Sequence, residues 1–222
     1  MATRGIVLDL DETVLDRNAT LLEYAARLYS EYGARVKIAQ EEFISLLNLL
    51  DGKGRAPRED FFKSLAEHAF HGISKNTLEE HFYENAWIKP IVFPGVVNFL
   101  TQMRDHRLPI GIVTNGRSTS QRAKLNNSGI VKLVDDFVIS EEFGARKPEP
   151  EIFFHISKKL GIEPKISWFI GDDPVSDIVG AKNVGFNTVW LERHLEWPAS
   201  HITCFDLKAT QINQLNYESF IA

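Results

Sequence analysis

Cysteine is nearly absent from this sequence, since Cys204 is the single one among 222 residues. An internal disulfide and a cysteine-ligated metal cluster are therefore excluded, and the composition suits a reducing compartment. No apolar run approaches the roughly 20 residues of a membrane span, and no apolar signal segment follows Met1. An excess of basic residues is also missing, because the formal net charge is −5. We expect a cytoplasmic protein whose partners include neither a membrane nor a nucleic-acid polymer.

What is present describes an ordinary globular chain with 44% hydrophobic and 25% charged residues. Short continuous apolar runs predict strands that are covered on both faces, because such strands do not alternate. These runs occupy residues 5–10, 108–114, 135–140, 166–172 and 185–191. Segments with helical spacing lie between them, and this alternation predicts an α/β fold, a parallel sheet with helices on both faces. A last edge strand is expected within residues 201–207.

Residues 17–88 differ from the rest, because they contain four segments with helical spacing and no strand-like run. We interpret them as an all-helical cap inserted after the first strand, with residues 1–16 and 89–222 forming the core domain. The aromatic residues of this segment are interpreted as its apolar core: Phe43, Phe61, Phe62, Phe82 and Trp87.

Polar and charged residues follow four of the predicted strands. Because the carboxyl ends of parallel strands meet at one edge of a sheet, we expect these residues to gather there. They are Asp9, Asp11, Thr114, Asn115, Lys147, Asp172, Asp173 and Asp177. Taken singly, each motif is also compatible with a solvated turn or an ordinary loop, and it is their order behind successive strands that indicates a site.

The residue types at this edge favour phosphoryl transfer. Hard carboxylate oxygens without histidine or cysteine nearby favour Mg²⁺ over zinc. Thr114 and Lys147 offer a hydrogen-bond donor and a positive charge to an anion. A carboxylate-bound Mg²⁺ beside a lysine is an arrangement suited to holding a phosphate.

Four segments resemble the motifs of the haloacid dehalogenase superfamily of hydrolases. They are "DLDETVLD", "VTNG", "RKPEPEIF" and "GDDPVSDIVGA". The resemblance spans nearly the whole chain and is to the phosphatase branch with a helical cap after the first motif, which includes phosphoglycolate phosphatases and nucleotidases. It implies a Rossmann-like core with the strand order 5-4-1-2-3.

The resemblance also implies a role for each motif residue. Asp9 matches the nucleophile and Asp11 the general acid/base, and both would bind the metal, Asp11 through its backbone carbonyl. Asp172 matches the metal-binding acid of the fourth motif.

The remaining motif residues match the family's phosphate-binding and supporting positions. Thr114, Lys147 and the backbone N–H of Asn115 would bind the phosphate. Asp177 matches a second acid that acts through water or orients the lysine. Asp173 could take either role of the fourth-motif acids, so the choice between Asp173 and Asp177 stays open.

The implied activity is Mg²⁺-dependent hydrolysis of a small phosphate monoester through an aspartyl-phosphate intermediate. Three alternatives remain: a sugar phosphomutase similar to β-phosphoglucomutase, a catalytically silent binding or regulatory protein, and a dehalogenase. The dehalogenases typically lack an acid at the position of Asp11. The expected partner is a small phosphorylated metabolite, while its identity and the oligomeric state stay open. A basic loop at residues 51–60 is either a solvated segment or a contact for an anionic leaving group.

Overall fold

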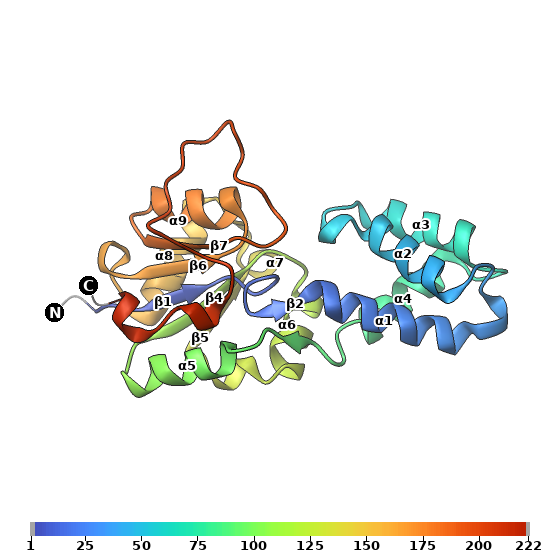
Figure 1. Ribbon diagram of the computed structural model, residues 1–222, viewed down its shortest axis with the longest axis horizontal. Helices are drawn as coiled ribbons and strands as arrows, with labels where there is room; N and C mark the ends of the chain where they lie inside the picture. Colours follow the sequence, from blue (N-terminus) through green and yellow to red (C-terminus); the bar gives the residue numbers. More distant parts are fainter. Residues whose placement is uncertain (1–2, 221–222) are drawn as a thin grey trace. The chain divides into compact units, whose positions relative to one another are not determined.

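The computed structural model describes residues 3–220, and the chain forms two compact units (Figure 1). One unit comprises Met1–Asp16 and Val92–Ala222, and the other comprises Arg17–Ile91. The cap was predicted to end at residue 88. Two short strands, β2 (Leu15–Asp16) and β3 (Ile91–Val92), pair with each other where the chain passes between the units.

The first unit contains a six-stranded parallel sheet with the strand order β5-β4-β1-β6-β7-β8. Its strands are β1 (Ile6–Leu8), β4 (Ile110–Thr114), β5 (Asp136–Ile139), β6 (Trp168–Gly171), β7 (Asn187–Leu191) and β8 (Leu207–Ala209). This confirms the predicted α/β, Rossmann-like fold. Within this sheet, β1, β4, β5, β6 and β7 also have the order that the family resemblance implied. Strand β8 adds a sixth strand at one edge.

The edge strand lies outside most of the segment predicted for it. It occupies residues 207–209, whereas residues 201–206 form a loop in which Ile202 is 91% exposed. Asp206 ends the ladder, because its carboxylate accepts the backbone N–H of Thr188 at 2.6 Å. The apolar residues of this loop therefore do not indicate a strand.

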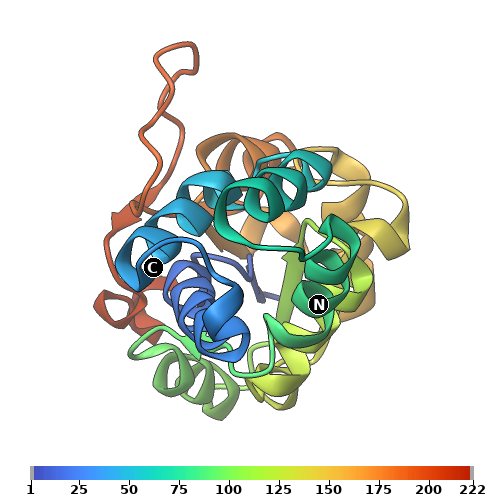
Figure 2. The ribbon, with the colours of Figure 1, turned by 90° about the vertical axis from the view of Figure 1, so that its right-hand side faces the viewer.

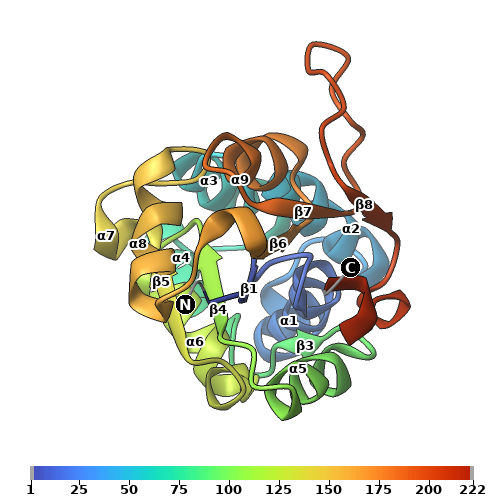
Figure 3. The ribbon, with the colours of Figure 1, turned by 90° about the vertical axis from the view of Figure 1, so that its left-hand side faces the viewer.

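Helices cover both faces of the sheet, so β1 is completely buried. Ile6 and Leu8 pack in the apolar cluster that includes residues of α5 (Val96–Asp105) and α6 (Ser118–Asn127). Val7 packs in the opposite cluster with residues of α8 (Pro150–Leu160) and α9 (Gly180–Asn183). Figure 3 shows the two pairs of helices on opposite sides of the strands. The continuous apolar run of β1 follows from this double cover.

Shorter helical segments complete the unit. They are α7 (Ser140–Phe143), a π-helical turn (Pro174–Val179) and 3₁₀ turns at 130–132, 164–166, 212–214 and 217–220. The π-helical turn was not predicted. Its sequence does carry a start signal, because Asp173 is the N-cap and Pro174 occupies the first helical position.

The second unit contains four α-helices, which Figure 2 shows in blue to green. They are α1 (Arg17–Tyr32), α2 (Gln40–Asp51), α3 (Arg58–Ala69) and α4 (Lys75–Asn85), with 3₁₀ turns at 33–35 and 52–54. Their core is aromatic: the Phe82 ring makes edge contacts with Phe61, Phe62 and Trp87 at centroid distances of 5.5–5.8 Å. The predicted aromatic core is thereby confirmed. No helix in the described part of the chain is long and apolar enough to cross a membrane.

One carboxylate joins three segments of the helical unit. Asp51 is fully buried at the end of α2, and both of its oxygens accept hydrogen bonds from Arg17 at 2.8 Å. Arg58 donates to it at 2.8 Å, and the Gly54 N–H donates at 2.7 Å. Arg58 of the basic loop is therefore held by Asp51, while Lys53 and Arg55 are exposed.

We predict that Asp51→Asn destabilises the protein by about 3 kcal/mol at pH 7, because two guanidinium groups lose their countercharge. Burial alone would raise the pKa of Asp51, but the bonds and charges of Arg17 and Arg58 outweigh it and lower this pKa below 3.8. The stabilisation is therefore complete above pH 3.8 and is lost as the pH falls through the lower folded-state value. Urea unfolding followed by circular dichroism at several pH values measures the difference.

Asp60→Asn, at an exposed position of α3, is the matched control and should cost less than about 1 kcal/mol. An equal loss for both variants would show that the ion pairs of Asp51 contribute nothing to stability.

Candidate active site

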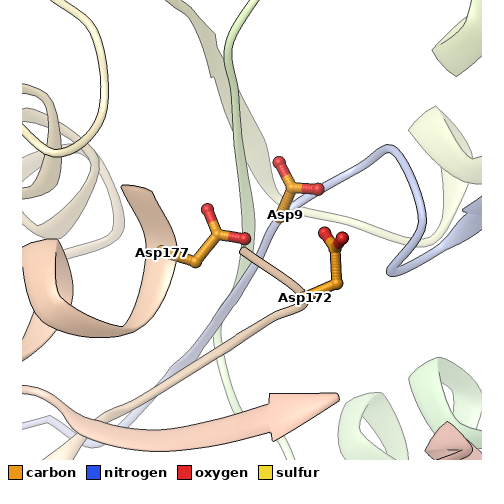
Figure 4. Close-up of side chains that lie close together, drawn as sticks. All are labelled: Asp9, Asp172 and Asp177. Atoms are coloured by element: carbon orange, nitrogen blue, oxygen red, sulfur yellow. The ribbon is translucent and has the colours of Figure 1, made fainter. Parts of the chain in front are cut away.

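Two buried aspartates lie side by side because they follow neighbouring strands. Asp9 directly follows β1, and its backbone N–H donates to the carbonyl of Ile170 in β6 at 2.9 Å. Asp172 directly follows β6, and its carbonyl accepts the indole N–H of Trp190 at 3.0 Å. The parallel register that pairs Leu8 with Ile170 brings both carboxylates to the same edge (Figure 4). The exposed fractions are only 7% for Asp9 and 8% for Asp172.

A third carboxylate reaches the same place from the π-helical turn. Carboxylate oxygens of Asp9, Asp172 and Asp177 all lie within 4.8 Å of one another. Figure 4 shows the three side chains converging from three segments. Asp177 also accepts the backbone N–H of Asp173 at 3.1 Å. The close approach of the Asp177 side chain to the backbone of β6 requires glycine at position 171, because a Cβ there would lie 2.4 Å from Asp177 Oδ2.

Lys147 brings a positive charge into this cluster. Its Nζ lies 2.5 Å from Asp9 Oδ1 and 2.7 Å from Asp177 Oδ1, and the residue is 2% exposed. The Asn115 side chain holds the backbone of Lys147 by donating to its carbonyl at 3.0 Å and accepting its N–H at 2.9 Å. The side chain of Asn115 thus acts as a clamp between the end of β4 and the loop that carries the lysine.

Asp173 and Asp177 have different surroundings. Asp173 Oδ1 accepts the backbone N–H groups of Val175 and Ser176, both at 2.9 Å, and so caps the π-helical turn. Among the described residues, the acidic cluster contains Asp177 and not Asp173.

The three carboxylates outnumber their cation, and burial strengthens the imbalance. Burial, opposed by Lys147 and reinforced by the charge of Asp177, raises the pKa of Asp9 to about 7. Burial and the charges of Asp177 and Asp9 raise the pKa of Asp172 well above its usual value. Burial alone would lower the pKa of Lys147, but Asp177 and Asp9 outweigh this effect and raise it. A further cation would relieve the repulsion.

Oxygen donors of this kind fit a hard divalent cation. The cluster offers carboxylate oxygens from Asp9, Asp172 and Asp177 and, within the described residues, neither imidazole nor thiolate. Such a donor set suits Mg²⁺ better than zinc. The residues present therefore fit the metal that the sequence predicts.

Asp11 and Thr114 lie beside this cluster and are linked to each other by helix α6. Asp11 accepts hydrogen bonds from Lys124 Nζ at 2.7 and 2.9 Å and from Gln121 Nε2 at 3.0 Å. Thr114 is 1% exposed, and its hydroxyl oxygen lies 2.5 Å from the same Gln121 nitrogen.

Gln121 and Lys124 were not singled out in the sequence, although α6 carries a signal for them. The sequence of α6, STSQRAKLNN, has few apolar residues. Its buried face must therefore contain polar side chains, and Ser120, Gln121 and Lys124 are all buried. Buried polar side chains require partners, which points to a neighbouring polar site.

The chain is similar to known proteins over most of its length. The family model for haloacid dehalogenase-like hydrolases matches residues 6–191. The glyceraldehyde 3-phosphate phosphatase of Methanocaldococcus jannaschii is 30% identical over 84% of this chain and 83% of that protein. The phosphatase of the same name from Methanopyrus kandleri is 28% identical over 86% of this chain and 84% of that protein. A crystal structure of the HAD-hydrolase YfnB from Bacillus subtilis superposes with a TM-score of 0.76 at 20% identity, with complete coverage of both chains.

The chain belongs to the haloacid dehalogenase-like hydrolase family. The resemblance read from its four motifs is confirmed, and the chain is a hydrolase whose two named relatives above are phosphatases.

We predict that Gly171→Ala destabilises the protein by about 2–3 kcal/mol, as overpacking does in a buried site. The added Cβ would meet Oδ2, Cβ and Cγ of Asp177 at 2.4–2.6 Å. In an Asp177→Gly background those atoms are gone, so the same substitution should cost little. Urea unfolding of the four proteins measures both effects. A cost below about 1 kcal/mol for Gly171→Ala alone would mean that the π-helical turn moves aside without penalty.

Proposed function

We propose that this protein is a Mg²⁺-dependent phosphatase that hydrolyses a small phosphate monoester through an aspartyl-phosphate. The main support is the position of Asp9, which lies at the end of a central strand within a cluster of carboxylates and beside Lys147. A carboxylate held in this way is a nucleophile suited to phosphorus, because Lys147 offsets part of the negative charge of the approaching phosphate, and a bound Mg²⁺ would add to this effect.

In the first step, an oxygen of Asp9 attacks phosphorus in line as the bond to the ester oxygen breaks. Asp11 gives its proton to the leaving oxygen. In the second step, Asp11 takes a proton from water as that water attacks phosphorus. The bond between phosphorus and Asp9 breaks, and inorganic phosphate leaves. Asp9 returns as a carboxylate and Asp11 returns protonated, so the cycle is balanced.

The remaining residues bind the phosphate and the metal. Lys147, the Thr114 hydroxyl and the backbone N–H of Asn115 bind the phosphoryl oxygens. Asp9, Asp172 and the backbone carbonyl of Asp11 would hold Mg²⁺. When bound, the metal supplies positive charge to the transferring group.

Of the fourth-motif acids, Asp177 orients Lys147 through their 2.7 Å contact. Asp173 shapes the turn that carries Asp177, through the two backbone N–H groups that it caps.

The substrate class is proposed from the relatives. Two relatives that match more than four fifths of this chain are glyceraldehyde 3-phosphate phosphatases. We therefore place small phosphorylated metabolites, triose phosphates first, at the head of a substrate panel. Release of inorganic phosphate is the assay, with EDTA and Asp9→Asn as negative controls. Full activity in either control would refute the proposed chemistry.

Magnesium is predicted to stabilise the folded protein as well as to support turnover. At a concentration of 100 times the dissociation constant, one bound ion adds about 2.7 kcal/mol. Thermal unfolding should therefore shift upward with Mg²⁺ in the wild type and much less in Asp172→Asn. Asp105→Asn, at an exposed position of α5, is the matched control and should respond as the wild type does. An equal shift in all three proteins would place the ion elsewhere.

The roles of Asp9 and Asp11 can be distinguished with nitrophenyl phosphate as the substrate, because its leaving group needs little protonation. Asp11→Asn should release a burst of about one equivalent of nitrophenolate and then stall, because the second step lacks its base. With an alkyl phosphate the same variant should barely react. Asp9→Asn should give no burst with either ester. A burst from Asp9→Asn would mean that another group is the nucleophile.

A further inference from the structure

The carboxylate of Asp11 is bound by two side chains that the proposed chemistry does not use. Lys124 Nζ lies 2.7 Å from one oxygen and 2.9 Å from the other, and Gln121 Nε2 lies 3.0 Å from the first. Both residues belong to α6 and are nearly inaccessible, with exposed fractions of 4% for Lys124 and 2% for Gln121. They are three residues apart, which puts both on one face of the helix.

The Gln121 amide can adopt only one orientation here. Its oxygen lies 2.8 Å from Lys124 Nζ, which can only donate, so that oxygen is the acceptor. The amide nitrogen is consequently the atom shared between Asp11 Oδ2 and Thr114 Oγ1. Because the nitrogen donates to the threonine oxygen, the hydroxyl proton of Thr114 must point away from Gln121.

Lys124 and Gln121 thus link a residue of the first motif with one of the second. Asp11 follows β1, and Thr114 ends β4, which is the neighbour of β1 in the sheet. The pairing of β1 with β4 ends at Leu8 and Ile112, so it leaves the side-chain torsions of Asp11 and Thr114 free. The Lys124–Gln121 pair restrains those torsions with hydrogen bonds at one end of each side chain.

Stability alone does not explain why Lys124 is buried. Burying a lysine costs free energy, and replacing a buried ion pair with apolar residues often leaves stability unchanged or improves it. Helix α5 shows that a helix of this unit can pack with apolar residues alone, because its buried residues are Val96, Phe99, Leu100 and Met103. A buried lysine on α6 therefore calls for a benefit other than stability.

We propose that Lys124 and Gln121 are positioning residues that hold the Asp11 carboxyl and the Thr114 hydroxyl in a fixed spacing. Asp11 would then face the ester oxygen of the substrate while Thr114 donates to a phosphoryl oxygen. This proposal rests on the phosphatase function proposed above. Lys124 acts on proton transfer through Asp11, whereas Gln121 acts on both Asp11 and the phosphate-binding hydroxyl.

The first test is the leaving-group dependence of Lys124→Met, which keeps an unbranched side chain and removes the charge. Single-turnover release of the alcohol from an alkyl phosphate should fall about 10²-fold or more, the usual contribution of a positioned proton donor. Release of nitrophenolate from nitrophenyl phosphate should fall less than about 10-fold, because that leaving group needs little protonation. Lys124→Arg, which retains the charge and donors, should recover most of the loss.

The second test is a double-mutant cycle with Asp11→Asn. If Lys124 acts through Asp11, the Lys124→Met and Asp11→Asn double variant should react with the alkyl phosphate within about 3-fold of Asp11→Asn alone. If Lys124 only supports the fold, the two losses should multiply. Lys158→Met, at an exposed position of α8, is the matched control and should behave as the wild type does.

Gln121→Leu separates the two ends of the network. It should raise KM as well as lower kcat, because Thr114 loses the bond that directs its hydroxyl. Lys124→Met should lower kcat with little change in KM. This contrast also covers the case in which one variant folds poorly, since the other still tests the proposal.

The outcomes distinguish the two proposals. A wild-type protein without Mg²⁺-dependent phosphate release would overturn the proposed function itself. An active wild type with multiplicative losses in the cycle, or equal losses on both esters for Lys124→Met, would overturn only the positioning role.

Discussion

The structure depends on carboxylates that are held together against their mutual repulsion. Asp9 and Asp172 cannot move apart, because each directly continues a buried strand and the two strands are paired in parallel. Burial of those strands supplies the favourable free energy, mainly through the hydrophobic effect. Lys147 then offsets part of the charge from a loop that the Asn115 side chain fixes. The apolar core of the sheet therefore holds the carboxylates of the charged edge close together. A bound cation would offset the negative charge that Lys147 leaves.

Features that involve the backbone were predicted from the sequence more fully than those that involve side-chain direction. The strands were recognised because short continuous apolar runs that alternate with helices are typical of a parallel sheet covered on both faces. The gathering of polar residues at one edge of the sheet was predicted from parallel pairing, because such pairing brings the ends of β1, β4 and β6 together whatever their side chains are. By contrast, Ile202 and its neighbours have strand-like composition, but they form an exposed loop. The pairing of β8 with β7 does not extend into this loop, because the Asp206 carboxylate accepts the backbone N–H of Thr188.

The site partners that could not be predicted are set by contacts between distant segments. Sequence order alone did not distinguish Asp173 from Asp177, because both follow β6 within one turn. The difference arises from the π-helical turn, which uses the Asp173 carboxylate as a cap and directs Asp177 toward Lys147. Gln121 and Lys124 were missed because a buried polar helix face resembles an exposed one until its neighbours are known. The cue in α6 was its shortage of apolar residues.

The two compact units each have an apolar core of their own, and this bears on how the chain loses its structure. The aromatic cluster around Phe82 and the bonds of Asp51 lie wholly within residues 17–91. The clusters around β1 involve only the other unit. Cooperativity arises from shared packing, so each unit has the means to open as a separate cooperative block. A single melting temperature would then average two equilibria, and a probe in one unit would report only one of them.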